Sequence, residues 1–380
     1  MRKVLFIATV KTHIEAFHLP YLKWFHEQGW ETSVCAKSDV GERGQSNRIQ
    51  HCDKYYNIPL SRNPFCFDNI RAYNRLKQII DDNDYDVVHC HTPVGGALGR
   101  LACRKARKKS LKVIYTAHGF HFYKGAPIVN WLLYYPIEKW LAHYTDVLIT
   151  INNEDYKRAR KFKCSQVVNI PGIGVSIEKY FDTYIKKDDK LTEIGIPANA
   201  FLLFSVGELN KNKNHEIIIR TIAEIGNERL HYAIAGKGPL KARIHDLAKK
   251  LDVAGQIHLL DYRTDVNELY KAADIFVFPS LREGLPVSVM EAMASGLPCL
   301  VSDIRGNKDL IEGGKGGYLY APKDHRGFSV GILQLYCDAA LRQQMGLFNQ
   351  NKVKTYDIKK TMAIMKKIYE QKFSDIIVKL

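Results

Sequence analysis

The sequence predicts an α/β protein built from two doubly wound domains. At 380 residues the chain is longer than a single hydrophobic core comfortably supports, so two domains are the default expectation. Short apolar segments alternate with amphipathic ones in both halves, which indicates parallel strands joined by crossover helices. A polar stretch with little periodicity separates the two halves.

Ten strands are expected from the apolar segments. In the first half they are KVLFIAT (3–9), ETSVCA (31–36), YDVVHC (85–90), KVIYTA (112–117) and DVLITI (146–151). In the second half they are FLLFSVG (201–207), HYAIAG (231–236), IHLL (257–260), DIFVFP (274–279) and LPCLVS (297–302). The amphipathic stretches between them supply the helices that parallel strands need for their connections.

The domain connection is expected between about Pro171 and Ala200, because IKKDDKLTEIGIPANA (185–200) is polar and contains Pro and Gly. The first domain then spans residues 1–170 and the second 171–350. A last helix is expected at roughly 351–374. Its apolar positions among lysines are Met362, Ile364, Met365, Ile368 and Tyr369.

The composition is that of an ordinary globular protein. Eight cysteines are scattered without CxxC pairs or a secretory signal, which favours a reduced cytoplasmic setting. The cluster His89, Cys90 and His91 ends a strand, where side chains alternate between faces, and no second ligand pair is evident. We therefore predict no metal site. No segment reaches the ~18 apolar residues that span a bilayer.

The net charge of +16 is unevenly distributed. Residues 1–180 contain 27 Lys and Arg against 16 Asp and Glu, a balance of +11. Residues 181–350 contain 21 of each, and residues 351–380 contain 8 against 3. All of the excess positive charge therefore lies at the two ends of the chain.

The most informative segment is DIFVFP followed by SLREGLPVSVMEAMASG and LPCLVS, which is typical of a strand, loop, helix and strand. Pro286 is expected in the first helical turn and Gly296 at the helix end. Such a helix start lies at the carboxyl end of a parallel strand, where backbone N–H groups suit a phosphate. Glu283 and Glu291 are then better explained as acceptors for hydroxyl groups. The alternative is that both are solvated charges that favour the helix dipole.

The string EGLPVSVMEAMASGLPCLVSDIRG resembles the E-x7-E signature of family-four retaining glycosyltransferases of the GT-B fold, many of which are bacterial capsule and exopolysaccharide enzymes. The resemblance covers nearly the whole chain. It implies two Rossmann-like domains that face each other across a cleft. The first would bind the acceptor, with residues 351–380 returning to it, and the second would bind the nucleotide sugar.

The resemblance also assigns roles within the motif. Glu291 is expected to accept hydrogen bonds from ribose hydroxyls, and Glu283 from the hexose. The segment between them is expected to bind the donor through Gly284, Leu285, Pro286 and Val287.

The turn GELNKNKNHE follows another strand and carries lysines ahead of a helix, where the dipole disfavours them unless an anion is present. By the resemblance, Gly207 lies beside the donor and Lys213 neutralises its diphosphate. The family has an arginine where this chain has Glu208, which leaves Lys211 or Arg305 as candidates for the second charge. From the residues alone, Lys213 is a solvated turn lysine.

Two further turns of the second half match the family. The turn GKGP contributes Gly236 beside the nucleotide, although glycines after a strand are a weak signal alone. The segment DYRTDVNELYKAAD resembles the one whose backbone contacts the base, and Arg263 is its candidate.

In the first half, YTAHGFHFYKG ends a strand at His118, which matches a family histidine that contacts the donor sugar; His121 is a weaker neighbour. The alternative is an ordinary loop histidine. The family has a glycine-rich loop after the first strand, but this chain has Thr12 and His13 there. Side-chain donation by these two residues would replace close approach of the backbone.

Residues 120–144 are rich in aromatic residues interleaved with Lys124 and Lys139. Such a stretch is either half core and half surface or an interfacial helix on anionic lipid. The charge distribution favours the second interpretation.

The resemblance implies a retaining, metal-independent hexosyltransferase that uses a UDP-sugar as substrate and no cofactor. It would transfer the sugar, of N-acetylhexosamine type, to a polyprenyl-linked saccharide on the cytoplasmic membrane face. A sugar-nucleotide epimerase of the same fold is one alternative. A nucleic-acid binder would explain the charge, and RKARKK (104–109) fits it, but no nucleic-acid motif is present.

Overall fold

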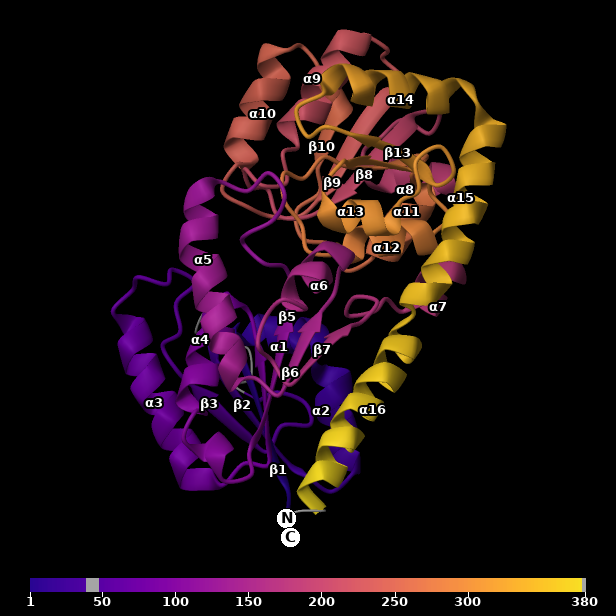
Figure 1. The fold of residues 1–380 in the computed structure, drawn as a ribbon. Coiled ribbons are helices and arrows are strands. Elements are labelled where there is room, and N and C mark those ends of the chain that lie inside the picture. Colours follow the sequence, from indigo (N-terminus) through magenta and orange to yellow (C-terminus); the bar gives the residue numbers. More distant parts are fainter. Residues whose placement is uncertain (39–47, 378–380) are drawn as a thin grey trace. The chain divides into compact units, whose positions relative to one another are not determined.

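The protein forms two compact units. The structure is a computed structural model that describes residues 1–38 and 48–377. The first unit comprises Met1–Ile173 and Thr361–Leu380, and the second comprises Gly174–Lys360. Figure 1 shows both as sheets with surrounding helices. In the described part of the chain, no helix is long and apolar enough to cross a membrane.

The first unit is built on a parallel sheet of seven strands in the order β3-β2-β1-β4-β5-β6-β7. The order reverses between β1 and β4, which is the topological switch point where open sheets of this kind bind ligands. The strands are β1 (Lys3–Val10), β2 (Glu31–Lys37), β3 (Lys54–Asn57), β4 (Val87–His91), β5 (Lys112–Ala117), β6 (Val147–Thr150) and β7 (Gln166–Asn169).

Helices cover both faces of this sheet, so the central strands read as continuous apolar runs. On one face, Gly99 of α4 packs so closely that a Cβ there would lie 2.6 Å from the Cys90 sulfur. On the other face, Tyr369 of α16 (Ile358–Ile377) stacks on Trp24 of α2 and meets Phe25 of α2 edge to face. The helices are α1 (Lys11–Phe17), α2 (Leu19–Glu27), α3 (Asp68–Asn83), α4 (Pro93–Ala102), η1 (Ala106–Lys108), α5 (Ile128–Leu141), η2 (Ala142–Tyr144) and α6 (Asn153–Ala159).

The second unit contains a parallel sheet of six strands in the order β10-β9-β8-β11-β12-β13, with its switch point between β8 and β11. The strands are β8 (Phe201–Val206), β9 (Leu230–Ala235), β10 (Ile257–Leu259), β11 (Ile275–Phe278), β12 (Cys299–Ser302) and β13 (Gly317–Tyr320). The helices are α7 (Ile177–Phe181), α8 (Lys187–Glu193), α9 (Glu216–Ile225), α10 (Lys241–Lys250), η3 (Ala254–Gln256), α11 (Val266–Ala272), α12 (Val287–Ala294), α13 (Arg305–Leu310), α14 (His325–Cys337), α15 (Ala339–Val353) and η4 (Lys354–Tyr356).

The predicted α/β class with two doubly wound sheets is confirmed. Three strands were not anticipated: β3, β7 and β13 each lie at a sheet edge. Most of their residues are only partly buried, so they lack the continuous apolar run that marks a central strand.

The end of the chain differs from the prediction of one helix from about 351. Residues 351–353 end α15, η4 follows, and the last helix is α16 (Ile358–Ile377). Asp357 interrupts the helices with an extended conformation, because its backbone bridges to Val175. The first unit takes up the chain again at Thr361.

Candidate active site

The E-x7-E segment forms the predicted strand, loop, helix and strand. β11 and β12 pair in parallel, with α12 between them in sequence. Pro286 lies one position earlier than expected: its φ of −76° and ψ of 124° make it the cap that precedes α12 rather than a residue of the first turn. Gly296, with φ of +83°, adopts the left-handed conformation that ends the helix as predicted.

Glu291 lies in α12 with both carboxylate oxygens engaged. The Tyr180 hydroxyl donates to Oε1 at 2.5 Å, and the Tyr270 hydroxyl donates to Oε2 at 3.0 Å. Burial raises the pKa of Glu291, whereas the two phenol hydrogen bonds act in the opposite direction. Each carboxylate oxygen can accept more than one hydrogen bond, so the tyrosines fix the group and leave acceptor capacity for a ligand.

Glu283 and Lys213 meet across the switch point of the second unit. Lys213 follows β8 and Glu283 follows β11, and these strands are neighbours in the sheet. Lys213 Nζ lies 2.8 Å from Glu283 Oε1 and 4.5 Å from the centroid of the Phe278 ring. Both side chains are partly exposed, so the pair is accessible to a ligand that carries an anion and hydroxyl groups.

The loop between β11 and α12 is fixed by neighbouring turns. Asn212 Nδ2 donates to the Arg282 carbonyl at 2.9 Å, and Arg305 Nε donates to the Glu283 carbonyl at 2.8 Å. Gly306 approaches the loop so closely that a Cβ would lie 2.2 Å from the Gly284 carbonyl oxygen. Gly284 of the loop and Val287, the first residue of α12, are partly exposed, whereas Leu285 and Pro286 between them are buried.

Gly207 and Gly236 pack two turns against each other. A Cβ on Gly236 would lie 1.9 Å from the Gly207 carbonyl oxygen, and a Cβ on Gly207 would lie 3.1 Å from Cε of Lys213. Gly207 thus leaves space along which the Lys213 side chain extends. Lys211 is exposed, and Glu208 accepts a hydrogen bond from Asn210 at 2.9 Å. The two glycines therefore support the site through the packing of its turns.

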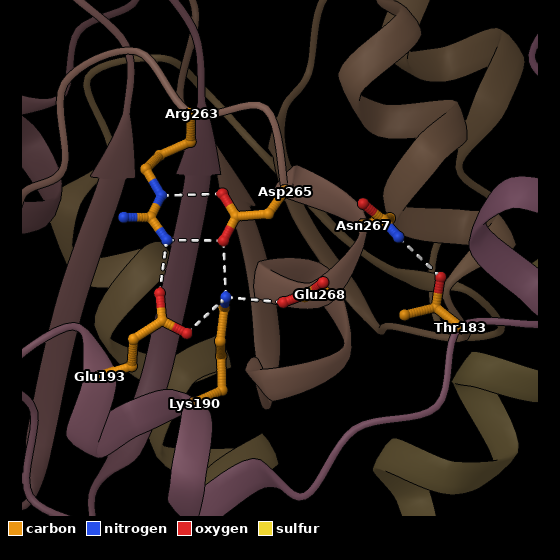
Figure 2. A network of polar contacts seen from close by, with 7 residues as sticks. All are labelled: Thr183, Lys190, Glu193, Arg263, Asp265, Asn267 and Glu268. Atoms are coloured by element: carbon orange, nitrogen blue, oxygen red, sulfur yellow. Dashed lines mark hydrogen bonds and ion pairs between the residues drawn. The ribbon is translucent and has the colours of Figure 1, made fainter.

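Arg263 belongs to an ionic network that Figure 2 shows from close by. Its guanidinium donates to Asp265 through two nitrogens, at 2.8 and 2.6 Å, and to Glu193 at 2.8 Å. Lys190 Nζ lies among Glu193, Asp265 and Glu268 at 2.6 to 2.8 Å. The network ties α8 to the start of α11, so the guanidinium of Arg263 is engaged by carboxylates. The expected contact of this segment with the base, through its backbone, stays a prediction.

A cation could in principle be held by Glu193, Asp265 and Glu268, whose oxygens lie within 4.8 Å of one another. However, the ammonium group of Lys190 contacts all three. Burial acts to lower the pKa of Lys190, but these hydrogen bonds outweigh burial and raise it. The ammonium group of Lys190 therefore occupies the place among these carboxylates that a metal ion would take.

In the first unit, His118 directly follows β5, and His13 lies in α1, directly after β1. Their ring centroids are 4.7 Å apart. Burial lowers the pKa of His13 to about 4 and that of His118 well below its ordinary value, so both are neutral at pH 7. Thr12 is exposed next to His13, and His121 packs on Tyr134 instead of joining the pair.

Two family descriptions match the chain. The one described as Glycosyl transferases group 1 matches residues 186–352, and the one described as Glycosyl transferase 4-like matches residues 3–152. The chain belongs to the family-four glycosyltransferases of the GT-B fold.

Similar proteins cover nearly all of this glycosyltransferase. EpsD of Bacillus subtilis (strain 168), named as a glycosyltransferase, is 41% identical over 97% of this chain and 96% of its own. The UDP-Gal:alpha-D-GlcNAc-diphosphoundecaprenol alpha-1,3-galactosyltransferase of Escherichia coli is 30% identical over 82% of this chain and 81% of its own. The crystal structure of Anabaena HepE in complex with UDP superposes with a TM-score of 0.78 at 17% identity, and the match covers 97% of this chain and 100% of HepE.

Some residues of the glycosyltransferase site could not be found from the sequence. Tyr180 and Tyr270, which hold Glu291, lie 111 and 21 residues from it in the chain. His18 and His91 join His13 and His118 because β1, β4 and β5 are adjacent in the sheet. Sequence spacing did not reveal either set, because the strand order decides which turns become neighbours.

Proposed function

We propose that this glycosyltransferase moves a hexosyl unit, of N-acetylhexosamine type, from a UDP-sugar to a lipid-linked saccharide with retention of anomeric configuration. The observation that carries the proposal is the Lys213–Glu283 pair at the switch point, next to the helix that holds Glu291. A cation, a carboxylate and a fixed hydroxyl acceptor together suit a ligand with a diphosphate and two polyols. HepE, which shares the fold, has been crystallised with UDP.

In this proposal each charged group has a separate task. Glu291 accepts the ribose hydroxyls while Tyr180 and Tyr270 hold its carboxylate in place. Arrival of the donor separates the 2.8 Å ion pair, so that Lys213 contacts the diphosphate and Glu283 contacts the hexose. The pair holds both side chains near their working positions beforehand, which reduces the ordering cost of binding.

The reaction then follows a same-face displacement. The bond between the anomeric carbon and the diphosphate oxygen breaks, and UDP leaves with the electron pair. The acceptor oxygen attacks from the same face and transfers its proton to a diphosphate oxygen. Lys213 stabilises the charge that develops on the leaving group, which is the part a metal ion plays in other enzymes. His118 is assigned a contact with the donor sugar.

The proposed acceptor is attached to a lipid, so the enzyme would work as a peripheral protein on the cytoplasmic membrane face. The name of the Escherichia coli relative includes a diphosphoundecaprenol acceptor. In the present chain, α5 exposes apolar side chains, among them Ile128 at 77% and Leu132 at 74%. Exposed apolar residues on a helix beside basic ones are suited to the headgroup region of an anionic bilayer.

The proposal is tested by incubating the purified enzyme with a panel of UDP-sugars and measuring the release of UDP. We expect slow hydrolysis of one donor, because water can take the place of the acceptor. Addition of a lipid-linked saccharide should accelerate release of UDP from that donor and lengthen the saccharide. If calorimetry detects no binding of UDP and every donor stays intact, the proposal is wrong.

A further inference from the structure

A cluster of four histidines lies at the carboxyl ends of three neighbouring strands in the first unit. His13 and His18 follow β1, His91 ends β4 and His118 follows β5. One ring nitrogen from each histidine lies within 4.8 Å of the corresponding nitrogens of the other three. Four donors from separate segments thus converge at the switch point of the sheet.

The distances within the cluster suit a metal ion. His13 Nε2 and His18 Nε2 are 3.3 Å apart, and His91 Nδ1 and His118 Nε2 are 3.4 Å apart. Two nitrogens on a tetrahedral zinc ion, each bonded at about 2.0–2.1 Å, lie about 3.3–3.4 Å from each other. Two N···N distances therefore already match the edges of such a tetrahedron, and the four ligand nitrogens all lie within 4.8 Å of one another.

The surroundings of the rings also suit a metal ion. His18 and His91 are buried, and imidazole nitrogens are common ligands of first-row transition metals. Nδ1 of His18 and Nε2 of His91 are buried and have no hydrogen-bond partner among the described residues. The other nitrogens of these two rings, Nε2 of His18 and Nδ1 of His91, are the ones that face His13 and His118.

Neighbouring residues set the limits of the site. His89 is excluded, because its two nitrogens contact Tyr369 Oη at 2.7 Å and Thr116 Oγ1 at 2.8 Å. Cys90 points to the opposite face of the sheet, toward Gly99. His13 and His118 are partly exposed, whereas His18 and His91 are buried, so an ion can enter from one side.

We propose that His13, His18, His91 and His118 form a site for a divalent first-row transition metal ion such as Zn²⁺. Four imidazole donors without a carboxylate favour this class over Mg²⁺ or Ca²⁺, which take oxygen ligands. Since His118 is assigned a donor-sugar contact above, a bound ion would also inhibit transfer. That consequence rests on the proposed function, whereas binding of the ion does not.

The test uses the full chain, freed of any affinity tag, and titrates it with Co²⁺ and Zn²⁺. We expect one equivalent of Co²⁺ to give the intense visible absorption of tetrahedral nitrogen coordination, which Zn²⁺ then abolishes by displacement. Zn²⁺ should also raise the unfolding midpoint of the first unit, because it binds only the folded cluster. Tryptophan fluorescence reports this unit alone, since Trp24, Trp30, Trp131 and Trp140 all lie in it.

Loss of a residue that only supports a metal ligand typically lowers metal affinity about 10- to 100-fold. His18→Gln and His91→Gln each remove a ligand and should therefore weaken Co²⁺ affinity by a larger factor. His26→Gln is the matched control, because His26 is an exposed histidine at the far end of α2. It should bind Co²⁺ as the parent does. The proposal is overturned if the parent protein binds no stoichiometric Co²⁺ or Zn²⁺. It is equally overturned if His26→Gln loses binding as much as the other two variants.

Discussion

At the scale of residues, the proposed donor site depends on how neighbours prepare each charged group. Glu291 is a single carboxylate held by two phenols, and the Tyr270 hydroxyl shares its one proton between Glu291 Oε2 at 3.0 Å and the Ser288 carbonyl at 2.9 Å. Loss of the carboxylate should therefore remove the hydroxyl acceptor without collapsing the pocket around it.

We expect Glu291→Ala to weaken UDP binding by about 2–3 kcal/mol, since ribose hydroxyls would lose a charged acceptor. This corresponds to a rise in Kd of about 30- to 150-fold, measurable by calorimetry. Tyr180→Phe is the control: it keeps the carboxylate and the ring, so its effect should be much smaller. Unchanged UDP affinity in folded Glu291→Ala protein would exclude the ribose role.

Lys213 is expected to stabilise the leaving diphosphate. Lys213→Ala should slow turnover by about two to three decades, the scale for losing one electrostatic stabiliser. It should also bind UDP and uridine with more similar affinities than the parent does. Lys211→Ala removes the same charge from an exposed position two residues away and serves as the comparison. If Lys211→Ala causes the larger loss, the diphosphate contact belongs to Lys211.

At the scale of elements, one buried ion pair joins two helices of the first unit. Arg100 of α4 is fully buried and donates to Glu138 of α5 at 2.8 Å. The Arg100 guanidinium lies 3.8 Å from the centroid of the Tyr115 ring, and the Tyr115 hydroxyl is 3.3 Å from Glu138. The pair therefore helps to hold α5, the helix with exposed apolar residues, against the sheet.

Glu138→Gln should lower the free energy of unfolding by about 3–5 kcal/mol, because it leaves a buried guanidinium without its counter-charge. Denaturant unfolding followed by tryptophan fluorescence measures this change. Glu27→Gln breaks the exposed pair between Lys23 and Glu27 and should have little effect. Equal stability of Glu138→Gln and Glu27→Gln would show that the buried pair contributes nothing.

The buried histidines predict a pH dependence for the same unit. Their folded-state pKa lies below the ordinary value of 6.5, at about 4 for His13 and about 3 for His89. The unfolded chain therefore binds more protons once the pH falls below about 6.5, and folded-state stability is lost from there downward. Each such histidine costs up to about 1.4 kcal/mol per pH unit.

Tryptophan-monitored urea unfolding at pH 7, 6 and 5 should thus show a stability that is nearly constant above 6.5 and declines steeply below it. Carboxylates whose pKa is lowered, such as Glu193, titrate at lower pH and do not confound this window. The same stability at pH 7 and pH 5 would mean that the cluster is not buried as described.

Elements differed in how far the sequence predicted them. Central strands such as β1 and β11 are buried on both faces, so their continuous apolar runs identified them as strands in the sequence. The edge strands β3, β7 and β13 are half-exposed and carried no such mark, whereas the edge strand β10 was predicted from its apolar residues. Glu283 and Lys213 were each assigned through the family resemblance, but their 2.8 Å contact depends on the pairing of β8 with β11. The four-histidine cluster escaped prediction for the same reason: the local periodicity of a sequence does not reveal the order of its strands in the sheet.

At the scale of the whole molecule, charge divides along the chain. Residues 1–180 and 351–380 carry the entire excess of +16, and residues 181–350 are neutral. Within the first of these segments, Lys105, Lys108 and Lys109 are exposed around η1. A membrane-facing role of the basic segments would account for this asymmetry.

We expect the enzyme to float with anionic vesicles at low salt and to be released as salt screens the attraction over about 8 Å at physiological ionic strength. Replacing Lys105, Lys108 and Lys109 by Gln should weaken binding about 100-fold, since each lysine near the surface contributes about 1 kcal/mol. Lys249 and Lys250, exposed at the end of α10, provide a control for charge loss in the second unit. Equal binding to neutral and anionic vesicles would refute the membrane role.

The central claim, sugar transfer with retention, is tested most directly by determining the anomeric configuration of the product. The enzyme would receive the UDP-sugar that it hydrolyses and a soluble analogue of the lipid-linked acceptor, and proton NMR would follow the new glycosidic bond. The account predicts a product with the same anomeric configuration as the donor, formed by the parent and nearly absent with Lys213→Ala. An inverted product, or equal rates for parent and variant, would contradict it.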